Sequence, residues 1–173
     1  MRTREATLPD AEQIHQLISA HFETGTLLPR SFAEICENVR DFVVAEDKGR
    51  IIGCGALHLY GSHLAEIRSI MVHHAHQRRG AGLLLVKALL KQAGKHKVNC
   101  VCLFTRIPQF FLRLGFSLAR RDDIPDKVYK DCSVCPRLHC CDEVAMVRGE
   151  LPKFAILAQP FSRSVNIDSP QAR

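Results

Sequence analysis

One short segment, residues 77–82, combines glycines with basic side chains in a way that suits phosphate chemistry. It follows an apolar stretch and precedes a Leu- and Ala-rich stretch that predicts a helix. Glycines let the backbone curl tightly with its N–H groups uncovered, and N–H groups at a helix N-terminus attract phosphate. The spacing fits neither a P-loop nor a dinucleotide-binding fingerprint. We predict a diphosphate-binding loop, with a plain turn and solvated arginines as the alternative; its residues are Gln77, Arg78, Arg79, Gly80, Ala81 and Gly82.

A second cluster of reactive side chains lies toward the C-terminus and contains Cys132, Cys135, Cys140 and Cys141, with His139 beside them. Thiolates and imidazoles are zinc ligands, and the first pair has zinc-knuckle spacing. A second well-spaced pair is missing, however, so we assign no metal ligand. Three alternatives stay open: zinc at Cys132, Cys135 and Cys140, oxidative pairing across the loop, or a loop of packed thiols.

Length and composition limit the kind of protein that carries these groups. The 173 residues suggest one domain, and 46% hydrophobic and 24% charged residues are typical of a globular protein. Subtracting 18 acidic from 24 basic side chains leaves a net charge of +6, which suits an anionic partner. Aromatic residues make up only 6% and Trp is absent, so we favour a small anionic ligand over nucleic acid. No apolar run is long enough to span a membrane and no signal core follows residues 1–6, so we expect a cytoplasmic protein with reduced thiols.

Hydrophobic periodicity and turn residues predict the elements that must position these groups. An extended entry over 2–7 precedes two helices, which open at Pro9-Asp10 and at Ser31; Glu34 completes a capping box with Ser31. The later elements are strands over 42–45, 50–60 and 65–72 in an antiparallel meander, a helix over 80–93, a strand over 98–105 buried on both faces, a helix over 108–114, and strands over 116–119 and 144–147. The predicted fold class is α+β, with a mixed, largely antiparallel central sheet and helices on both faces.

The loop and the order of elements resemble the GNAT acetyltransferase superfamily. Gln77-x-x-Gly80-x-Gly82 after a strand is similar to its acyl-coenzyme A loop, and residues 108–116 resemble its later motif, Phe-Tyr-x-x-x-Gly-Phe. Other segments are similar to the acetyltransferase domain of the short bacterial N-acetylglutamate synthases, namely 27–30, 52–57, 65–69, 103–106 and 114–116. We therefore expect an acetyltransferase domain over residues 1–148 and a partly disordered tail over 149–173.

The resemblance implies a reaction: transfer of an acetyl group from acetyl-CoA to the α-amino group of L-glutamate, the first step of arginine biosynthesis. Such a transfer needs a base, because the α-amine is mostly cationic at neutral pH. Glu66 is the candidate, since a glutamate occupies this place in several members, and burial in an apolar sheet would raise its pKa. A structural ion pair between Glu66 and Arg68 is the alternative.

One residue departs from the superfamily pattern. Phe111 stands where the superfamily frequently has a Tyr as general acid, and a phenyl ring cannot donate a proton. Tyr129 is the candidate acid in its place, with a plain packing role as its alternative. Otherwise Ser69 donates, or the thiolate leaves unassisted, which an ordinary thiol pKa near about 8.5 allows.

The resemblance also implies contacts to both substrates. The backbone of Ile70, Met71 and Val72 would bind the pantetheine arm and polarise the thioester carbonyl. For a dicarboxylate acceptor, the candidate anchors are Arg30, Arg106 and Lys127, with solvated surface charges as the alternative.

Two other functions stay open at this point. One is the same chemistry on another amino acid or small amine. The other is a catalytically inactive binding module that responds to metal or redox state. Neither nucleic acid nor membrane is an expected partner, and the sequence leaves open whether the chain forms a homodimer.

Overall fold

The computed structural model describes residues 1–23 and 29–151, and its centre is a seven-stranded sheet in the order β1-β2-β3-β4-β5-β7-β6. Strands β4 and β5 pair in parallel and every other neighbouring pair is antiparallel. This confirms the predicted mixed, largely antiparallel sheet. The strands are β1 (Arg2–Glu5), β2 (Phe42–Asp47), β3 (Arg50–Leu59), β4 (Ala65–Val72), β5 (Cys100–Thr105), β6 (Ser117–Leu118) and β7 (Val144–Gly149).

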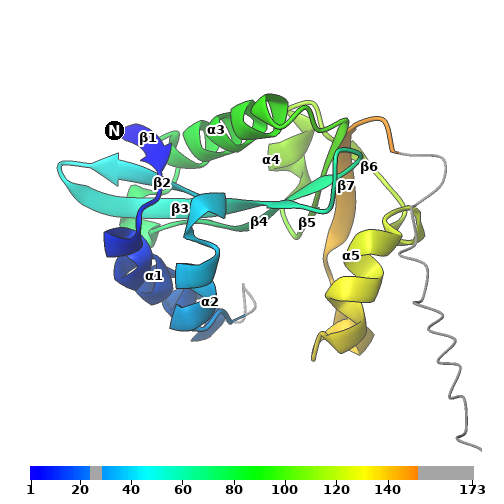
Figure 1. The fold of residues 1–173 in the computed structure, drawn as a ribbon, viewed down its shortest axis with the longest axis horizontal. Coiled ribbons are helices and arrows are strands. Elements are labelled where there is room, and N and C mark those ends of the chain that lie inside the picture. Colours follow the sequence, from blue (N-terminus) through cyan, green and yellow to red (C-terminus); the bar gives the residue numbers. More distant parts are fainter. Residues whose placement is uncertain (24–28, 152–173) are drawn as a thin grey trace, which may run out of the picture.

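Helices cover both faces of the sheet, as predicted (Figure 1). On one face lie α3 (Ala81–Lys95) and α4 (Pro108–Leu112), and on the other lie α1 (Ala11–Glu23), α2 (Phe32–Glu37) and α5 (Pro125–Lys130). Short 3₁₀ turns occur at Leu8–Asp10, Val39–Asp41, His74–His76, Arg121–Asp123, Cys132–Val134 and Leu138–Cys140.

Alternation along the central strands decides which side chains meet which helices. Val101 and Leu103 of β5 join the apolar cluster formed with α3, whereas Cys100 and Cys102 join a separate cluster with Ile124, just before α5. Both faces of β5 are therefore buried, as its apolar sequence predicts. Ala65 and Ile67 of β4 pack toward α3 in the same way, which turns Glu66, between them, toward α5.

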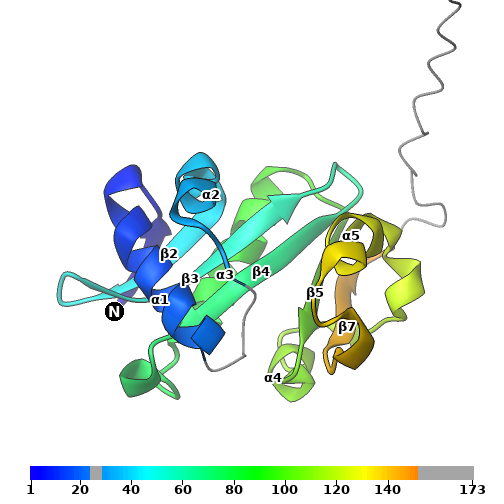
Figure 2. The same cartoon turned by 90° about the horizontal axis from the view of Figure 1, so that it is seen from below.

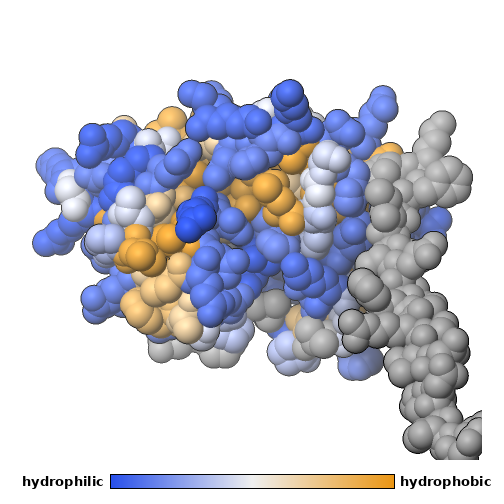
Figure 3. Space-filling view, in the orientation of Figure 1, coloured by the Kyte–Doolittle hydropathy of each residue, from blue (hydrophilic) through white to orange (hydrophobic). Residues whose placement is uncertain are grey.

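The helix over 80–93 is predicted almost correctly: it runs from Ala81 to Lys95, and Gly80 is its N-cap. Lys87 and Lys91 are exposed on its outer side, where hydrophilic side chains dominate the surface (Figure 3). Only one of the two hydrogen bonds of the predicted capping box at Ser31 forms. The Ser31 hydroxyl accepts from the Glu34 N–H at 3.1 Å, but the Glu34 carboxylate pairs with Arg30 instead.

The structure differs from the sequence prediction at α5 and at residue 149, and two predicted segments fall outside the described residues. Helix α5 was not predicted; it has only six residues, so hydrophobic periodicity gives little signal there. Gly149 ends β7 rather than starting a tail, and the rest of the expected tail, from residue 152, lies outside the described residues, as does the predicted break at 24–26. In the described ranges, no helix has both the length and the apolar character needed to cross a membrane.

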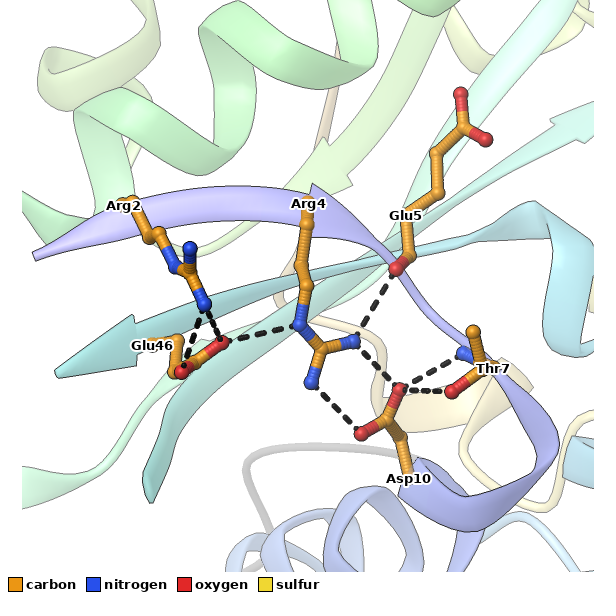
Figure 4. A network of polar contacts seen from close by, with 6 residues as sticks. All are labelled: Arg2, Arg4, Glu5, Thr7, Asp10 and Glu46. Carbon is orange, nitrogen blue, oxygen red and sulfur yellow. Dashed lines mark hydrogen bonds and ion pairs between the residues drawn. The ribbon is translucent and has the colours of Figure 1, made fainter. Parts of the chain in front are cut away.

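A polar network ties the edge strand β1 to the turn that starts α1 (Figure 4). The Arg4 guanidinium donates to both carboxylate oxygens of Asp10, at 2.7 and 2.9 Å, and to Glu46 at 3.0 Å. Asp10 also accepts from the N–H and the hydroxyl of Thr7, at 2.8 and 2.9 Å. Hydrogen bonds from Arg4 hold the pKa of Asp10 well below its usual value, although burial opposes the shift.

Replacing the buried Asp10 by Asn is expected to lower the free energy of unfolding at pH 7 by about 2 kcal/mol, because Arg4 then lacks its charged acceptor. A carboxylate whose pKa is lower when folded stabilises above its unfolded pKa, near about 4, and loses that contribution as pH falls further. The difference between wild type and Asp10→Asn in urea unfolding should therefore be smaller at pH 3 than at pH 7. The matched control is Asp122→Asn, whose side chain is 81% exposed. Equal differences at both pH values would contradict this account.

Candidate functional site

The predicted phosphate loop joins the end of β4 to α3 and is exposed from Gln77 to Gly80. Gly80 has a φ of 89° and Arg78 one of 60°, so the backbone turns through left-handed positions there. No side chain caps the start of α3, although the first N–H groups of any helix lack intrahelical acceptors. The first residue of the loop is tied to the end of β4, because the Gln77 side-chain amide donates to the Val72 carbonyl at 3.0 Å. This arrangement suits an anion such as a diphosphate.

Strand β4 changes its pairing halfway along. Its parallel partner β5 contacts it at only two positions, Ala65↔Val101 and Glu66↔Cys102, and the two strands then run apart (Figure 2). Opposite β3, the register shifts between Cys54 and Ala56, and Ser69 takes a φ of 50°. Within the described ranges, the β5-facing edge of β4 beyond Glu66 therefore has no strand partner. Ile70, Met71 and Val72 lie on this edge, where an extended ligand can bond to main chain.

The Glu66 carboxylate lies where β4 and β5 part, and it is 2% exposed. Its Oε1 is 2.8 Å from the Lys127 ammonium of α5, and its Oε2 accepts from the Tyr60 hydroxyl at 3.0 Å. Lys127 also donates to Asp131 at 2.8 Å. The predicted alternative, an ion pair between Glu66 and Arg68, is wrong, because the ammonium at Glu66 comes from Lys127.

These contacts shift the pKa values of the groups around Glu66. Burial alone would lower the pKa of Lys127, but the charges of Glu66 and Asp131 outweigh it, so the pKa is raised and the ammonium stays charged. Burial, together with the negative charge of Glu66, raises the pKa of the Tyr60 phenol, which stays a proton donor. For Asp131, burial opposes ionisation, yet the hydrogen bond and charge of Lys127 lower the pKa.

Two arginines predicted to bind carboxylates already have partners. Arg30 pairs with Glu34, and its Nε donates to the Ser69 hydroxyl at 3.3 Å, directly at the irregularity of β4. Arg106 follows β5, and its Nε donates to Asp142 at 2.6 Å. Because a guanidinium has five N–H donors, these contacts leave Arg30 able to bind a further carboxylate. Arg30 thus lies beside β4, whereas Arg106 is tied to the loop before β7.

The three relevant aromatic residues occupy different environments. Phe111 is 2% exposed and packs edge-on against Phe110 and Phe116, as a core residue. Tyr129 is 69% exposed on α5, and its role as an acid stays a prediction. Tyr60, which the sequence reading did not single out, is the phenol that contacts Glu66. The short turn after β3 could have revealed it, since pairing of His58 with Glu66 puts residues 58, 60 and 66 on one face.

All eight cysteines are free thiols. Cys54 and Cys100 are buried core residues, as predicted, and burial raises their pKa to about 12 and about 11. In the cysteine-rich loop, Cys132 is buried and Cys141 Sγ lies 3.1 Å from Arg121 Nη2. Across residues 1–23 and 29–151, no group of three or more His, Cys, Asp or Glu is placed to hold a metal ion. The described part of the chain thus provides no support for the zinc alternative or the metal-responsive module.

Comparison with known proteins identifies the family and the fold. Residues 11–116 match the acetyltransferase (GNAT) family model. The chain is 39% identical over 145 residues to an uncharacterized N-acetyltransferase of Chlorobaculum tepidum, covering 84% of this chain and 94% of that protein. It is 32% identical over 131 residues to an amino-acid acetyltransferase of Mycobacterium tuberculosis, covering 74% and 75% of the two chains.

Solved structures agree with the sequence relatives. A Mycobacterium tuberculosis protein in complex with CoA superposes with a TM-score of 0.73 at 28% identity, covering 87% of this chain and all of that one. The N-acetylglutamate synthase of Neisseria gonorrhoeae, complexed with coenzyme A and N-acetyl-glutamate, gives 0.75 at 26% identity, covering 87% of this chain and 35% of that one. The chain belongs to the GNAT acetyltransferase family and has the GNAT fold. It is an acyl-CoA-dependent N-acetyltransferase, which confirms the resemblance.

The loop supplies a matched pair of glycine variants, because Gly80 and Gly49 both have positive φ and both leave open space for a Cβ. Each Gly→Ala change is expected to cost about 1 kcal/mol of stability through backbone strain. Only Gly80→Ala should also weaken coenzyme A binding in calorimetric titration, by about tenfold, because the N–H groups at the helix start are displaced. Equal coenzyme A affinity in both variants would exclude this loop as the diphosphate site.

Proposed function

We propose that the protein transfers an acetyl group from acetyl-CoA to the α-amino group of L-glutamate. The observation that carries this proposal is the buried Glu66 carboxylate at the point where β4 and β5 part. A carboxylate there lies beside the open edge of β4, and on the same strand Ser69 contacts the Arg30 guanidinium. The named amino-acid acetyltransferases and the N-acetylglutamate synthase structure support glutamate as the acceptor.

The residues fit the proposed co-substrate. N–H groups at the start of α3, with Arg78 and Arg79 beside them, would hold the diphosphate of acetyl-CoA. The unpaired edge of Ile70, Met71 and Val72 would bond the extended arm and direct an N–H to the thioester oxygen. Acetyl-CoA supplies the acetyl group as a thioester; this chain's own groups orient it and manage the protons.

Glu66 acts as the base in this proposal. The acceptor's ammonium gives up a proton to Glu66, directly or through a water, which frees the nitrogen lone pair. A carbon–nitrogen bond to the acetyl carbon then forms and the carbon–sulfur bond breaks. The new amide nitrogen gives up its second proton, and the departing thiolate takes up one proton, so that the products are the amide and the free thiol. Arg30 would bind an acceptor carboxylate with the donors that Glu34 and Ser69 leave over. Tyr129 is the predicted acid that protonates the thiolate. The thiolate can also leave without an acid, because its ordinary pKa is low enough.

One comparison favours a second candidate, the same transfer to another amino acid or small amine. The Chlorobaculum tepidum relative, at 39% identity, is named only as an N-acetyltransferase. In addition, the chain spans only 28–29% of several longer amino-acid acetyltransferases that it matches. Arginine biosynthesis and a cytoplasmic location are parts of the glutamate proposal and depend on it.

The acceptor is tested by measuring thiol release from acetyl-CoA against a panel of L-amino acids and small amines. We expect the highest kcat/KM for L-glutamate, with L-glutamine and L-aspartate at least tenfold lower, because each changes the charge or the spacing of the second carboxylate. Higher kcat/KM for a neutral amine would replace glutamate by the second candidate.

Glu66→Gln removes the base and keeps the shape of the side chain. We expect kcat to fall about 100-fold or more while coenzyme A affinity stays within about twofold of wild type. Melting temperature is measured alongside, because Lys127 loses one of its two charged partners in this variant. Glu37→Gln, an exposed change on α2, serves as the control. Unchanged turnover in a folded Glu66→Gln protein would remove Glu66 from the mechanism.

A further inference from the structure

Glu66 needs a counter-charge, because a carboxylate that is 2% exposed loses most of its hydration. The counter-charge comes from Lys127, whose side chain is 12% exposed and whose ammonium lies 2.8 Å from Oε1. Asp131, one turn later, takes a second hydrogen bond from the same ammonium at 2.8 Å. The Lys127 ammonium therefore bridges two carboxylates, whose combined negative charge already exceeds its own, and only one of its three N–H donors is left.

Helix α5 is fixed by further contacts on both sides of Lys127. Asp126 lies 3.4 Å from the His63 ring, and the Lys130 ammonium lies 2.8 Å from His58 Nε2. These contacts attach α5 to the end of β3 and to the turn that follows it. As a result, the distance between Lys127 and Glu66 is set by the fold, not by a flexible surface side chain.

Charged and titratable groups face Glu66 from each element packed on it. His58 of β3 and Cys102 of β5 are its register partners, Tyr60 donates to it, and Lys127 and Asp131 come from α5 and its end. Farther out, Asp41 lies 3.9 Å from His58, Lys130 lies over the Tyr60 ring, and the charge of Arg68 reaches Asp131. Of these groups in the described ranges, Lys127 alone forms an ion pair with Glu66.

We propose that Lys127 is a positioning residue, which balances the charge of Glu66 and fixes its Oε1, rather than an anchor for the acceptor's carboxylate. Tyr60 fixes Oε2 in the same way, so each oxygen keeps one lone pair for the acceptor's proton or a bridging water. This inference rests on the proposed role of Glu66 as base. It revises the expectation from sequence that Lys127 binds substrate directly.

The direct test follows the Glu66 carboxyl carbon by ¹³C NMR during a pH titration of the whole protein, with the signal assigned from Glu66→Gln. Lys127→Gln keeps a hydrogen-bond donor but removes the charge, so the midpoint should rise by about one pH unit or more. Lys127→Arg should restore most of the wild-type value. Lys91→Met removes an exposed lysine on α3 and should change nothing. An unmoved midpoint in Lys127→Gln, or an equal rise in Lys91→Met, would overturn the proposal.

A second measurement needs no Lys127 variant, and it tests the ion pair between Lys127 and Glu66 even if Lys127→Gln does not fold. The ¹⁵Nζ signal of Lys127 in the wild-type protein should shift with the same midpoint as the Glu66 carboxyl, because the two groups share a hydrogen bond. A Lys127 ¹⁵Nζ chemical shift that does not change while Glu66 titrates would contradict the ion pair.

Kinetics separate this role from direct substrate binding. For a positioning residue, the acidic limb of kcat/KM moves to higher pH in Lys127→Gln while KM for L-glutamate at high pH changes little. A carboxylate anchor would instead raise KM tenfold or more and leave the limb in place, which would refute the proposal. Failure of the wild-type enzyme to acetylate glutamate would count against the proposed function alone, since both NMR measurements read the ion pair without turnover.

Discussion

The structure depends on the short parallel pairing between β4 and β5. The two strands share only the pairs Ala65↔Val101 and Glu66↔Cys102 before they separate. Longer pairing would consume the main-chain groups of β4 that an extended ligand needs, and no pairing would leave Glu66 without the packing that buries it. The irregularity at Ser69, with its φ of 50°, further turns β4 away from a regular ladder. A single local feature therefore creates both the open edge and the buried carboxylate next to it.

The two faces of the sheet carry different parts of the candidate site. The face under α3 and α4 is apolar and supports the loop at Gly80, where the helix start offers N–H groups to an anion. On the opposite face, Glu66 of β4 contacts Tyr60 and, on α5, Lys127. Arg30, just before α2, contacts Ser69 of β4. Strand β4 exposes main-chain groups along one edge and directs Glu66 to the α5 face. In the proposed function, a thioester would therefore bind at the edge of β4 and an amine on its α5 face. In this proposal, the GNAT fold thus places the candidate diphosphate loop and the candidate base, Glu66, at opposite ends of one strand.

Much of this arrangement could be predicted from the sequence. The strand over Ala65–Val72, the helix after Gly80 and the two-sided burial around Cys100 follow from periodicity and glycine placement. The contacts of Glu66 could not be predicted in the same way, because Lys127 is 61 positions away in sequence and lies on a six-residue helix without a clear periodic signal. Spacing along one strand suggested Arg68 as the ion-pair partner of Glu66, but the packing of α5 against the sheet places Lys127 there instead. Tyr60 was missed because its importance comes from hairpin register and not from its neighbours in sequence.

The central claim is that the acceptor amine meets Glu66 at the point where β4 and β5 part. A crystal structure of the wild-type protein with coenzyme A and N-acetyl-L-glutamate tests this most directly. The account predicts the arm of coenzyme A along the main chain of residues 70–72, its diphosphate at residues 78–82, and the acetylated nitrogen within hydrogen-bond reach of Glu66, directly or through one water. Product bound on the α3 face, or with its nitrogen far from Glu66, would contradict it.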